Sequence, residues 1–303
     1  MPFDLITVLG PTASGKTSIA SQLARDFNGE IISADSRQVY RGMDIGTGKD
    51  LIEFQNCNIN YHLIDIVEPI EDYSLFRFTK DFLSSFEEIR KKNKLPILVG
   101  GTGLYISAIL QLYNMPEIDD AERKELFSLT FNQLKDLLLK LKPKQHNVTD
   151  LKDKDRVIQA ILIERSRKNN KPIFPELNSL TIGINPKREE TKRRITERLR
   201  QRLAHGMIEE VAELLGKGVS AERLNYFGLE YKFVSQYIDG RLNYYDMFQK
   251  LNSAIHSFAK RQRTWFRKME KEGVLINWFP PDSYPEIRKF ANSQLSNAES
   301  LSK

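Results

Sequence analysis

Short apolar runs bounded by turn residues alternate with longer amphipathic stretches through the first third of the chain. The runs lie at Leu5–Leu9, Glu30–Ala34, His62–Val67 and Leu95–Val99. Between them, apolar positions at helical spacing predict helices over Thr17–Phe27 and Leu75–Lys92. Strands that alternate with helices build parallel sheets, because the crossover between parallel strands needs a connection of helical length. The pattern therefore predicts an α/β fold, a parallel sheet with flanking helices.

The alternation stops after the fourth run, and a long stretch without a strand signal follows. Helical patterns in this stretch cover Asp120–Phe131, Gln133–Leu141 and Asp155–Arg167. Strand-like runs return at Leu180–Ile184 and Val274–Trp278. We therefore predict an α/β core from residues 1–114 and 179–295, and an inserted helical subdomain from 115–178. The insertion is either a cap over the sheet or a grip for a substrate.

Two further helices are predicted in the last third of the chain. A basic one extends from Lys187 to about Gly216, and an amphipathic one covers Tyr244–Lys271. The Ser-rich stretch after Ala291 should fray at the end of the chain, and we assign 296–303 to a flexible tail.

Composition excludes several classes of protein. The 303 residues carry 46 Lys and Arg against 40 Asp and Glu, so the net charge of +6 favours an anionic partner only where positive residues cluster. The single cysteine, Cys57, excludes an intrachain disulfide and a thiolate-rich zinc site. No apolar run approaches the roughly 20 residues that cross a bilayer, and the N-terminus lacks a signal-peptide pattern. We expect a monomeric, cytoplasmic protein without a membrane contact.

A phosphate-binding motif stands between the first predicted strand and the helix that follows. Residues 10–17 read GPTASGKT and match G-x-x-x-x-G-K-[ST] in the strand–turn–helix context that this pattern requires. In such a P-loop, backbone N–H groups and the positive end of the helix dipole bind an anion. Lys16 would neutralise terminal phosphate oxygens, and Thr17 would ligate Mg²⁺. The motif predicts a P-loop NTPase-like fold and a polyphosphate ligand, without identifying that ligand.

Two more loops follow strands of the same predicted sheet. The second strand ends in ADSRQVY, so the Asp35 carboxylate stands where ligands of open α/β sheets bind. Asp35 is a candidate base or metal ligand, unless it only caps a following helix. The fourth strand runs into GGTGLY, which is a second glycine-permitted turn at this edge. The three loops are therefore expected to face one cleft.

Five sequence blocks occur in an order typical of one family. They are GPTASGKT, ADSRQVYRGMDIGTGK, HLIDIVEP, LVGGTGLY and AKRQRTWFR. Together they resemble the tRNA dimethylallyltransferases, also called tRNA isopentenyltransferases, over about residues 5–280. The resemblance implies transfer of a dimethylallyl group from dimethylallyl diphosphate to the exocyclic N6 amine of the adenine on the 3′ side of the tRNA anticodon. It also implies that the P-loop holds the prenyl diphosphate with Mg²⁺ and not a nucleotide.

The resemblance also implies roles for individual residues. It assigns catalysis to Lys16, Thr17, Asp35 and Thr102, with Asp35 as the base for the adenine amine and Thr102 beside the reacting carbon or the bridging oxygen. The implied diphosphate site consists of Gly10, Pro11, Thr12, Ala13, Ser14, Gly15, Lys16, Thr17 and Arg188. The implied contacts to the tRNA anticodon stem-loop are Asp35, Ser36, Arg37, Gln38, Thr102, Arg123, Asp155, Arg156, Gln159, Lys260, Arg261, Arg263 and Arg267.

Some of these assignments have competing interpretations. Arg37 could be a surface residue, and Arg188 could be merely exposed if Glu190 and Arg194 form an i,i+4 ion pair. On the helix over 244–271, a rotation of about 100° per residue separates two faces. The predicted apolar face has Phe248, Leu251, Ile255, Phe258, Ala259 and Phe266, and the opposite face has Lys260, Arg263, Thr264 and Arg267.

Two residues depart from the family pattern. Gln159 stands where arginine is common, which removes a possible phosphate contact. Glu230 interrupts the usual Gly-Tyr-Arg pattern and puts the local turn and its RNA contact in doubt.

Three other functions remain open at this stage. An adenylate isopentenyltransferase would share the donor site, although a free nucleotide requires neither the insertion nor the basic helices. A P-loop small-molecule kinase or NTPase would use Leu63-Ile64-Asp65 as a metal-holding strand end. A non-catalytic RNA-binding module is the third, and the combination of Asp35 with the P-loop disfavours it.

Overall fold

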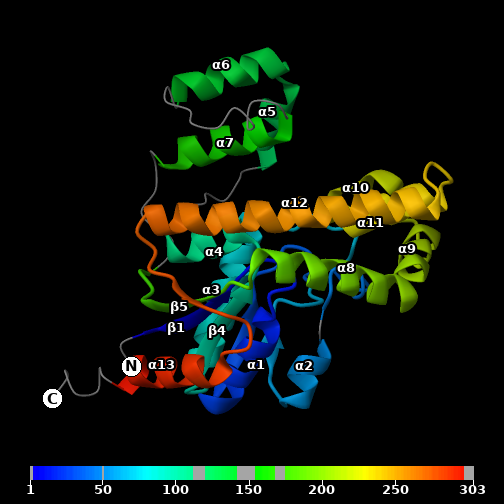
Figure 1. Cartoon of the computed structure of the whole chain (residues 1–303). Coiled ribbons are helices and arrows are strands. Elements are labelled where there is room, and N and C mark those ends of the chain that lie inside the picture. The colour runs from blue at the N-terminus through cyan, green and yellow to red at the C-terminus, as the bar shows by residue number, and fades with distance from the viewer. Residues whose placement is uncertain (1–2, 50, 112–119, 142–153, 168–174, 297–303) are drawn as a thin grey trace.

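Strands from distant parts of the chain meet in one parallel sheet. In the computed structural model (Figure 1), which describes residues 3–49, 51–111, 120–141, 154–167 and 175–296, the strand order is β3-β2-β4-β1-β5-β6. The strands span Leu5–Leu9 (β1), Gly29–Ser33 (β2), Tyr61–His62 (β3), Leu95–Gly100 (β4), Ser179–Ile184 (β5) and Asn277–Phe279 (β6). All neighbouring pairs are parallel, which confirms the predicted α/β class.

Helices cover the sheet and extend away from it. They span Lys16–Asp26 (α1), Leu51–Asn56 (α2), Leu75–Lys91 (α3), Gly103–Leu110 (α4), Asp120–Ser128 (α5), Phe131–Leu141 (α6), Lys154–Arg167 (α7), Arg188–Ala204 (α8), Met207–Gly216 (α9), Ala221–Phe227 (α10), Leu229–Ile238 (α11), Tyr244–Lys271 (α12) and Tyr284–Ser296 (α13). The predicted bounds of α12 are confirmed. Within the described ranges, none of the helices is both long and apolar enough to cross a bilayer.

The two faces of the sheet bury different apolar side chains. Leu5 and Leu9 of β1 belong to a cluster with α3, α4, α8, α11 and α12. Ile6 and Val8 belong to a second cluster with α1 and α13. This alternation follows the two-residue period of a strand. Because helices cover both faces, the open approach to the sheet is at the ends of its strands.

The third apolar run forms a shorter strand than predicted. β3 contains only Tyr61 and His62, whereas the prediction covered His62–Val67. Leu63 and Asp65 have φ angles of 62° and 56°, in the left-handed region where an extended strand cannot continue. The chain then runs as a loop beside the segment that follows β2.

The basic stretch predicted as a single helix forms two helices. Gly206, which lies between α8 and α9, has a φ angle of 99°. Glycine adopts this angle without the steric cost of a Cβ atom, so the chain turns here. At the C-terminus, the prediction of fraying after Ala291 is wrong as far as Ser296, because α13 continues and buries Ala291 and Leu295 against the sheet cluster. Residues 297–303 lie outside the described residues.

Helices α5, α6 and α7 share a hydrophobic cluster of their own. Its buried members are Leu126, Leu134, Leu138, Val157, Ile158, Ile161 and Leu162. Figure 1 shows these helices on the side of α12 that faces away from the sheet. Helices α5, α6 and α7 therefore do not cap the sheet directly. The predicted subdomain boundary at 115 lies outside the described residues, whereas the boundary at 178 falls immediately before β5.

A buried carboxylate on β2 bonds residues at the amino ends of the neighbouring strands β3 and β4. Glu30 of β2 is fully buried and accepts hydrogen bonds from Asn60 Nδ2 (3.0 Å), His62 Nε2 (2.8 Å) and Lys94 Nζ (2.8 Å). Burial alone would raise the pKa of Glu30, but the hydrogen bonds from Lys94, Asn60 and His62 outweigh it and lower the pKa to about 2.

Glu30→Gln should reduce stability at neutral pH. A carboxyl whose pKa is depressed in the folded state stabilises the fold above the pKa of the unfolded chain, near 4.5. That contribution, about 3 kcal/mol, is lost as the pH falls from about 4.5 towards 2. Urea unfolding of both proteins between roughly pH 7 and pH 3 should show that the difference between their free energies of unfolding becomes smaller as the pH falls. A difference in unfolding free energy that does not change with pH would contradict the lowered pKa of Glu30.

Candidate active site

A cleft of about 690 Å³ opens at the carboxyl ends of the central strands. Loops after β1, β2 and β4 line it on one side, and α8, α10, α11 and α12 line it on the other. The predicted site residues that line the cleft are Thr12, Lys16, Thr17, Asp35, Ser36, Arg37, Gln38, Thr102 and Arg261. The structure thus brings the three loops to one cavity.

The P-loop is tied to the loop after β4 through a residue of α12. The Thr12 N–H donates to Gln262 Oε1 (2.8 Å), and Gln262 Nε2 donates to the Gly101 carbonyl (2.8 Å). Gln262 is nearly buried between the two loops. Gln262 is not among the residues predicted for the site, although it lies at helical spacing between buried positions 259 and 266 of α12. A buried amide at such a position usually serves the backbone groups around it.

Asp35 and Thr102 lie on adjoining loops. Asp35 Oδ1 accepts the Arg37 N–H (3.0 Å), and the Thr102 hydroxyl accepts the Ser36 N–H (3.3 Å). The residues after Asp35 form turns and no helix, so the interpretation of Asp35 as a helix cap is wrong. Instead, one carboxylate oxygen closes an Asx turn, and Asp35 Oδ2 has no hydrogen-bond partner among the described residues.

Aromatic residues that the sequence analysis did not assign to the site line the opposite wall. Tyr226 is half exposed, and the Arg37 guanidinium lies 4.7 Å from its ring centroid, so Arg37 is part of the cleft wall. Phe258 lines the cleft at 38% exposure, which corrects its predicted place on the buried face of α12. Trp265, which lies about two helical turns after Phe258 on α12, donates from Nε1 to the Ser107 hydroxyl (2.9 Å). These residues could have been grouped from the sequence, because positions 258, 262 and 265 share a helix face.

Trp265 also explains one glycine of the GGTG turn. A Cβ atom at Gly103 would lie 2.3 Å from Cδ1 of the indole ring, far inside contact distance. The close approach of α4 to α12 at this point therefore requires glycine, and it positions Thr102 at the cleft.

Arg263 does not face outward as predicted. Its Nη2 donates to the Pro186 carbonyl (2.8 Å) and to the Thr191 hydroxyl (2.6 Å), so it fastens α12 to the start of α8. Burial lowers the pKa of Arg263, and the nearby guanidinium groups of Arg267 and Arg188 lower it further. The helical periodicity correctly predicted that this face of α12 is polar. It could not predict that the start of α8 covers part of that face.

The other predicted cations have different positions. Lys260, Arg261 and Arg267 are exposed on α12, and Arg188 is exposed at the start of α8 outside the cleft lining. Arg194 pairs with Glu190 at 2.6 Å, the ion pair that the competing interpretation required. The side chains of Arg123, Asp155, Arg156 and Gln159 lie outside the described residues.

Glu230, which departs from the family pattern, lies in the cleft lining at the start of α11. Its Oε1 is 3.5 Å from Arg202 Nη1. Burial raises the pKa of Glu230 above its ordinary value, and Arg202 opposes that shift. The pair thus adds a shielded carboxyl and a guanidinium to the wall opposite Asp35.

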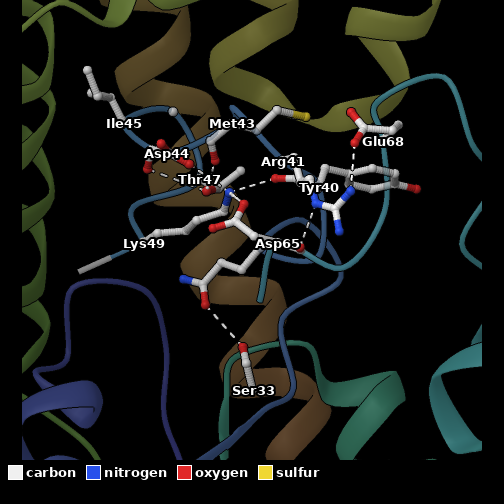
Figure 2. A network of polar contacts seen from close by, with 12 residues as sticks. Ser33, Tyr40, Arg41, Met43, Asp44, Ile45, Thr47, Lys49, Asp65 and Glu68 are labelled. Carbon is white, nitrogen blue, oxygen red and sulfur yellow. Dashed lines mark hydrogen bonds and ion pairs between the residues drawn. The ribbon is translucent and has the colours of Figure 1, made fainter. Parts of the chain in front are cut away.

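The carboxylate that a kinase would need is already engaged. Asp65 accepts a hydrogen bond from the buried Lys49 ammonium, which also donates to the Tyr40 carbonyl (2.6 Å) and to Asp44 Oδ1 (2.7 Å), as Figure 2 shows. Asp65 is absent from the described cleft lining. This arrangement disfavours the kinase interpretation.

The cleft offers oxygen donors that suit Mg²⁺. The Thr17 hydroxyl and the Asp35 carboxylate both line it, and hard oxygen ligands are those that Mg²⁺ prefers. Among the described residues, no group of three or more acidic, His or Cys side chains could hold a metal. Magnesium sites of this kind take much of their coordination from substrate phosphates and water, so the residues fit an ion that arrives with a diphosphate.

Comparisons with known proteins agree with this geometry. The family model described as "IPP transferase" matches residues 38–269. The chain is a member of the IPP transferase family. A second model, "Isopentenyl transferase", matches residues 3–62. A "tRNA dimethylallyltransferase 2" of Pelobacter propionicus is 54% identical over 91% of this chain and 89% of its own length.

Solved structures of this family share the fold. The tRNA isopentenylpyrophosphate transferase of Bacillus halodurans matches 98% of both chains at 33% identity, with a TM-score of 0.73. A eukaryotic dimethylallyltransferase acting on tRNA matches 97% of this chain and 79% of its own at 24% identity, with a TM-score of 0.79, and supports the fold alone. The predicted P-loop NTPase-like fold with its parallel sheet is therefore confirmed.

Proposed function

We propose that this protein transfers a dimethylallyl group from dimethylallyl diphosphate to the N6 amine of the adenine on the 3′ side of a tRNA anticodon. The observation that carries the proposal is that Lys16 and Thr17 share one cleft with Asp35 and Thr102. Lys16 and Thr17 suit an anionic leaving group, and Asp35 and Thr102 suit a reacting amine. The names of the relatives supply the substrate class.

The P-loop side of the cleft suits diphosphate release. As the allylic carbon–oxygen bond breaks, negative charge develops on the diphosphate, and we propose that the Lys16 ammonium, which lines the cleft, stabilises this charge together with amides of the P-loop. Mg²⁺ held by the Thr17 hydroxyl and the diphosphate would neutralise part of the same charge.

The loops after β2 and β4 suit the acceptor. The lone pair of the adenine amine is delocalised into the ring, so the amine needs a base on its N–H as the new carbon–nitrogen bond forms. Asp35 accepts the Arg37 N–H through Oδ1, which leaves Oδ2 to orient the amine and take its proton. We propose that the Thr102 hydroxyl, which accepts the Ser36 N–H beside the same turn, contacts the reacting groups.

The adenine must leave the anticodon stack to enter the cleft. Extrusion costs a few kcal/mol, which stacking on aromatic side chains can offset. Tyr226, Phe258 and Trp265 supply such surfaces. We propose that the exposed Lys260, Arg261 and Arg267 bind RNA phosphates nearby, and that the subdomain over residues 115–178 grips the stem-loop.

A transfer assay tests the proposed function. The protein is incubated with Mg²⁺, labelled dimethylallyl diphosphate and either unmodified tRNA, AMP or ATP alone. We expect label in tRNA, at the adenine beside the anticodon. Label only in AMP would favour an adenylate isopentenyltransferase, and phosphate release from ATP alone would favour a kinase or NTPase.

Arg267→Ala should weaken tRNA binding and flatten its salt dependence, whereas Arg263→Ala should leave the slope unchanged. Each lost phosphate contact lowers the slope of log Kd against log salt by about 0.7–0.9. Arg267 is exposed, but Arg263 is engaged with Pro186 and Thr191, so its removal should lower thermal stability instead. Equal slopes for Arg267→Ala and the wild type would show that Arg267 faces solvent only.

A further inference from the structure

One wall of the cleft is a backbone loop that follows β2. Gly46, Thr47 and Gly48 line the cavity. A loop of this kind, without regular secondary structure, has to find partners for its own N–H and carbonyl groups. In this structure, one side chain accepts the N–H groups of Asp44, Ile45 and Gly46, and different side chains donate to the carbonyls of Gly46 and Gly48.

The N–H groups are bonded by a carboxylate on α9. Glu210 Oε2 accepts the N–H groups of Asp44 (2.8 Å) and Ile45 (2.6 Å), and Oε1 accepts that of Gly46 (3.0 Å). The Tyr231 hydroxyl donates to the same Oε1 (2.7 Å). Four hydrogen bonds to one ionised group are stronger than four between neutral groups. Glu210 itself is absent from the described cleft lining.

The carbonyl groups are bonded by residues of the cleft. Gln38 Nε2 donates to the Gly48 carbonyl (3.1 Å), and Arg202 Nη1 donates to the Gly46 carbonyl (3.2 Å). The Ser33 hydroxyl donates to Gln38 Oε1 (3.0 Å), so both ends of this amide are oriented. The loop therefore fixes two polar side chains that line the cleft.

The end of the loop is anchored separately. Figure 2 shows the Lys49 ammonium between Tyr40, Asp44 and Asp65. This anchor holds the chain ends of the loop, but its bonds do not reach the backbone of residues 45–48. That middle part is held by Glu210 on one side, by Gln38, Arg198 and Arg202 on the side of the cleft, and by the bond from the Gly48 N–H to the Ile45 carbonyl (3.2 Å).

We propose that Glu210 is a positioning residue for the acceptor half of the site. By holding consecutive N–H groups, it fixes the carbonyls that orient the Gln38 amide and the Arg202 guanidinium towards the extruded purine. Among the described residues, the hydrogen bonds of Glu210 go to the loop and to Tyr231 and not to the P-loop, so we expect the donor half to be independent of it. This inference rests on the proposed tRNA substrate.

Glu210→Gln tests the inference, because the amide keeps the size of the side chain but puts an NH₂ group against N–H donors. We expect kcat/KM for tRNA to fall by about 10- to 100-fold. The KM for dimethylallyl diphosphate should stay within about twofold. Glu209→Gln is the matched control, because Glu209 is the exposed neighbour on the same helix. It should behave as the wild type.

Tyr231→Phe keeps the test valid if Glu210→Gln does not fold. It removes one of the four bonds to the carboxylate, and we expect a loss of about five- to tenfold for tRNA alone. A purely structural role would lower the melting temperature and leave both substrates' constants unchanged, or change them together. Either result would overturn the inference. A wild type that modifies no tRNA would instead overturn the proposed function.

Discussion

Asp35→Asn should slow prenyl transfer by about 10²- to 10⁴-fold, the range for loss of a general base. The asparagine oxygen can still accept the Arg37 N–H, so the turn should persist. Its amide group cannot take a proton from the adenine amine. Single-turnover rates at saturating tRNA measure the chemical step, and the Kd for tRNA should stay within about threefold of the wild-type value.

The control for this substitution is Asp239→Asn. Asp239 lies at the end of α11, where it pairs with Arg241 on the surface. Its loss removes the same charge from the protein and should leave the rate unchanged. If Asp35→Asn retained the wild-type rate, the base would have to be another group, and Glu230 is the other carboxyl in the described cleft lining.

Lys16→Met should lower kcat by about 10²- to 10³-fold, as expected when one group that stabilises developing charge is removed. Methionine has a similar length and no charge, so it preserves much of the packing at the start of α1. The diphosphate gains charge as the bond to the allylic carbon breaks, so the Lys16 ammonium matters more in the transition state than in the bound substrate. Steady-state kinetics with varied dimethylallyl diphosphate separate kcat from KM.

Two outcomes distinguish the role of Lys16. A fall in kcat together with weaker inhibition by the product diphosphate would support a leaving-group site. A rise in the KM for the donor at constant kcat would mean that Lys16 binds the ground state and the transition state equally. Lys217→Met provides the control, because Lys217 is exposed and pairs with Glu213 on α9.

Local sequence determined the parts of this protein that depend on near neighbours. The bounds of α12 follow from apolar spacing and from Asn243, whose side chain accepts the Asp246 N–H (2.9 Å). The P-loop is a continuous motif, so its strand–turn–helix context could be recognised without any distant contact. The cleft could also be predicted, because the carboxyl ends of parallel strands meet at one edge of the sheet.

Only the tertiary structure decided whether a given residue on a helix is buried or exposed. Apolar spacing placed Phe258 in the core and Arg263 in solvent, but packing of α12 against α8 and the cleft reversed both. Glu210 bonds Ile45 across 165 positions of sequence, and Gln262 bonds Thr12 across 250. Periodicity reports the polarity of a helix face, whereas such contacts depend on the order in which strands and helices assemble. For that reason the sequence located the chemistry of the site, and the fold determined the residues that hold it in place.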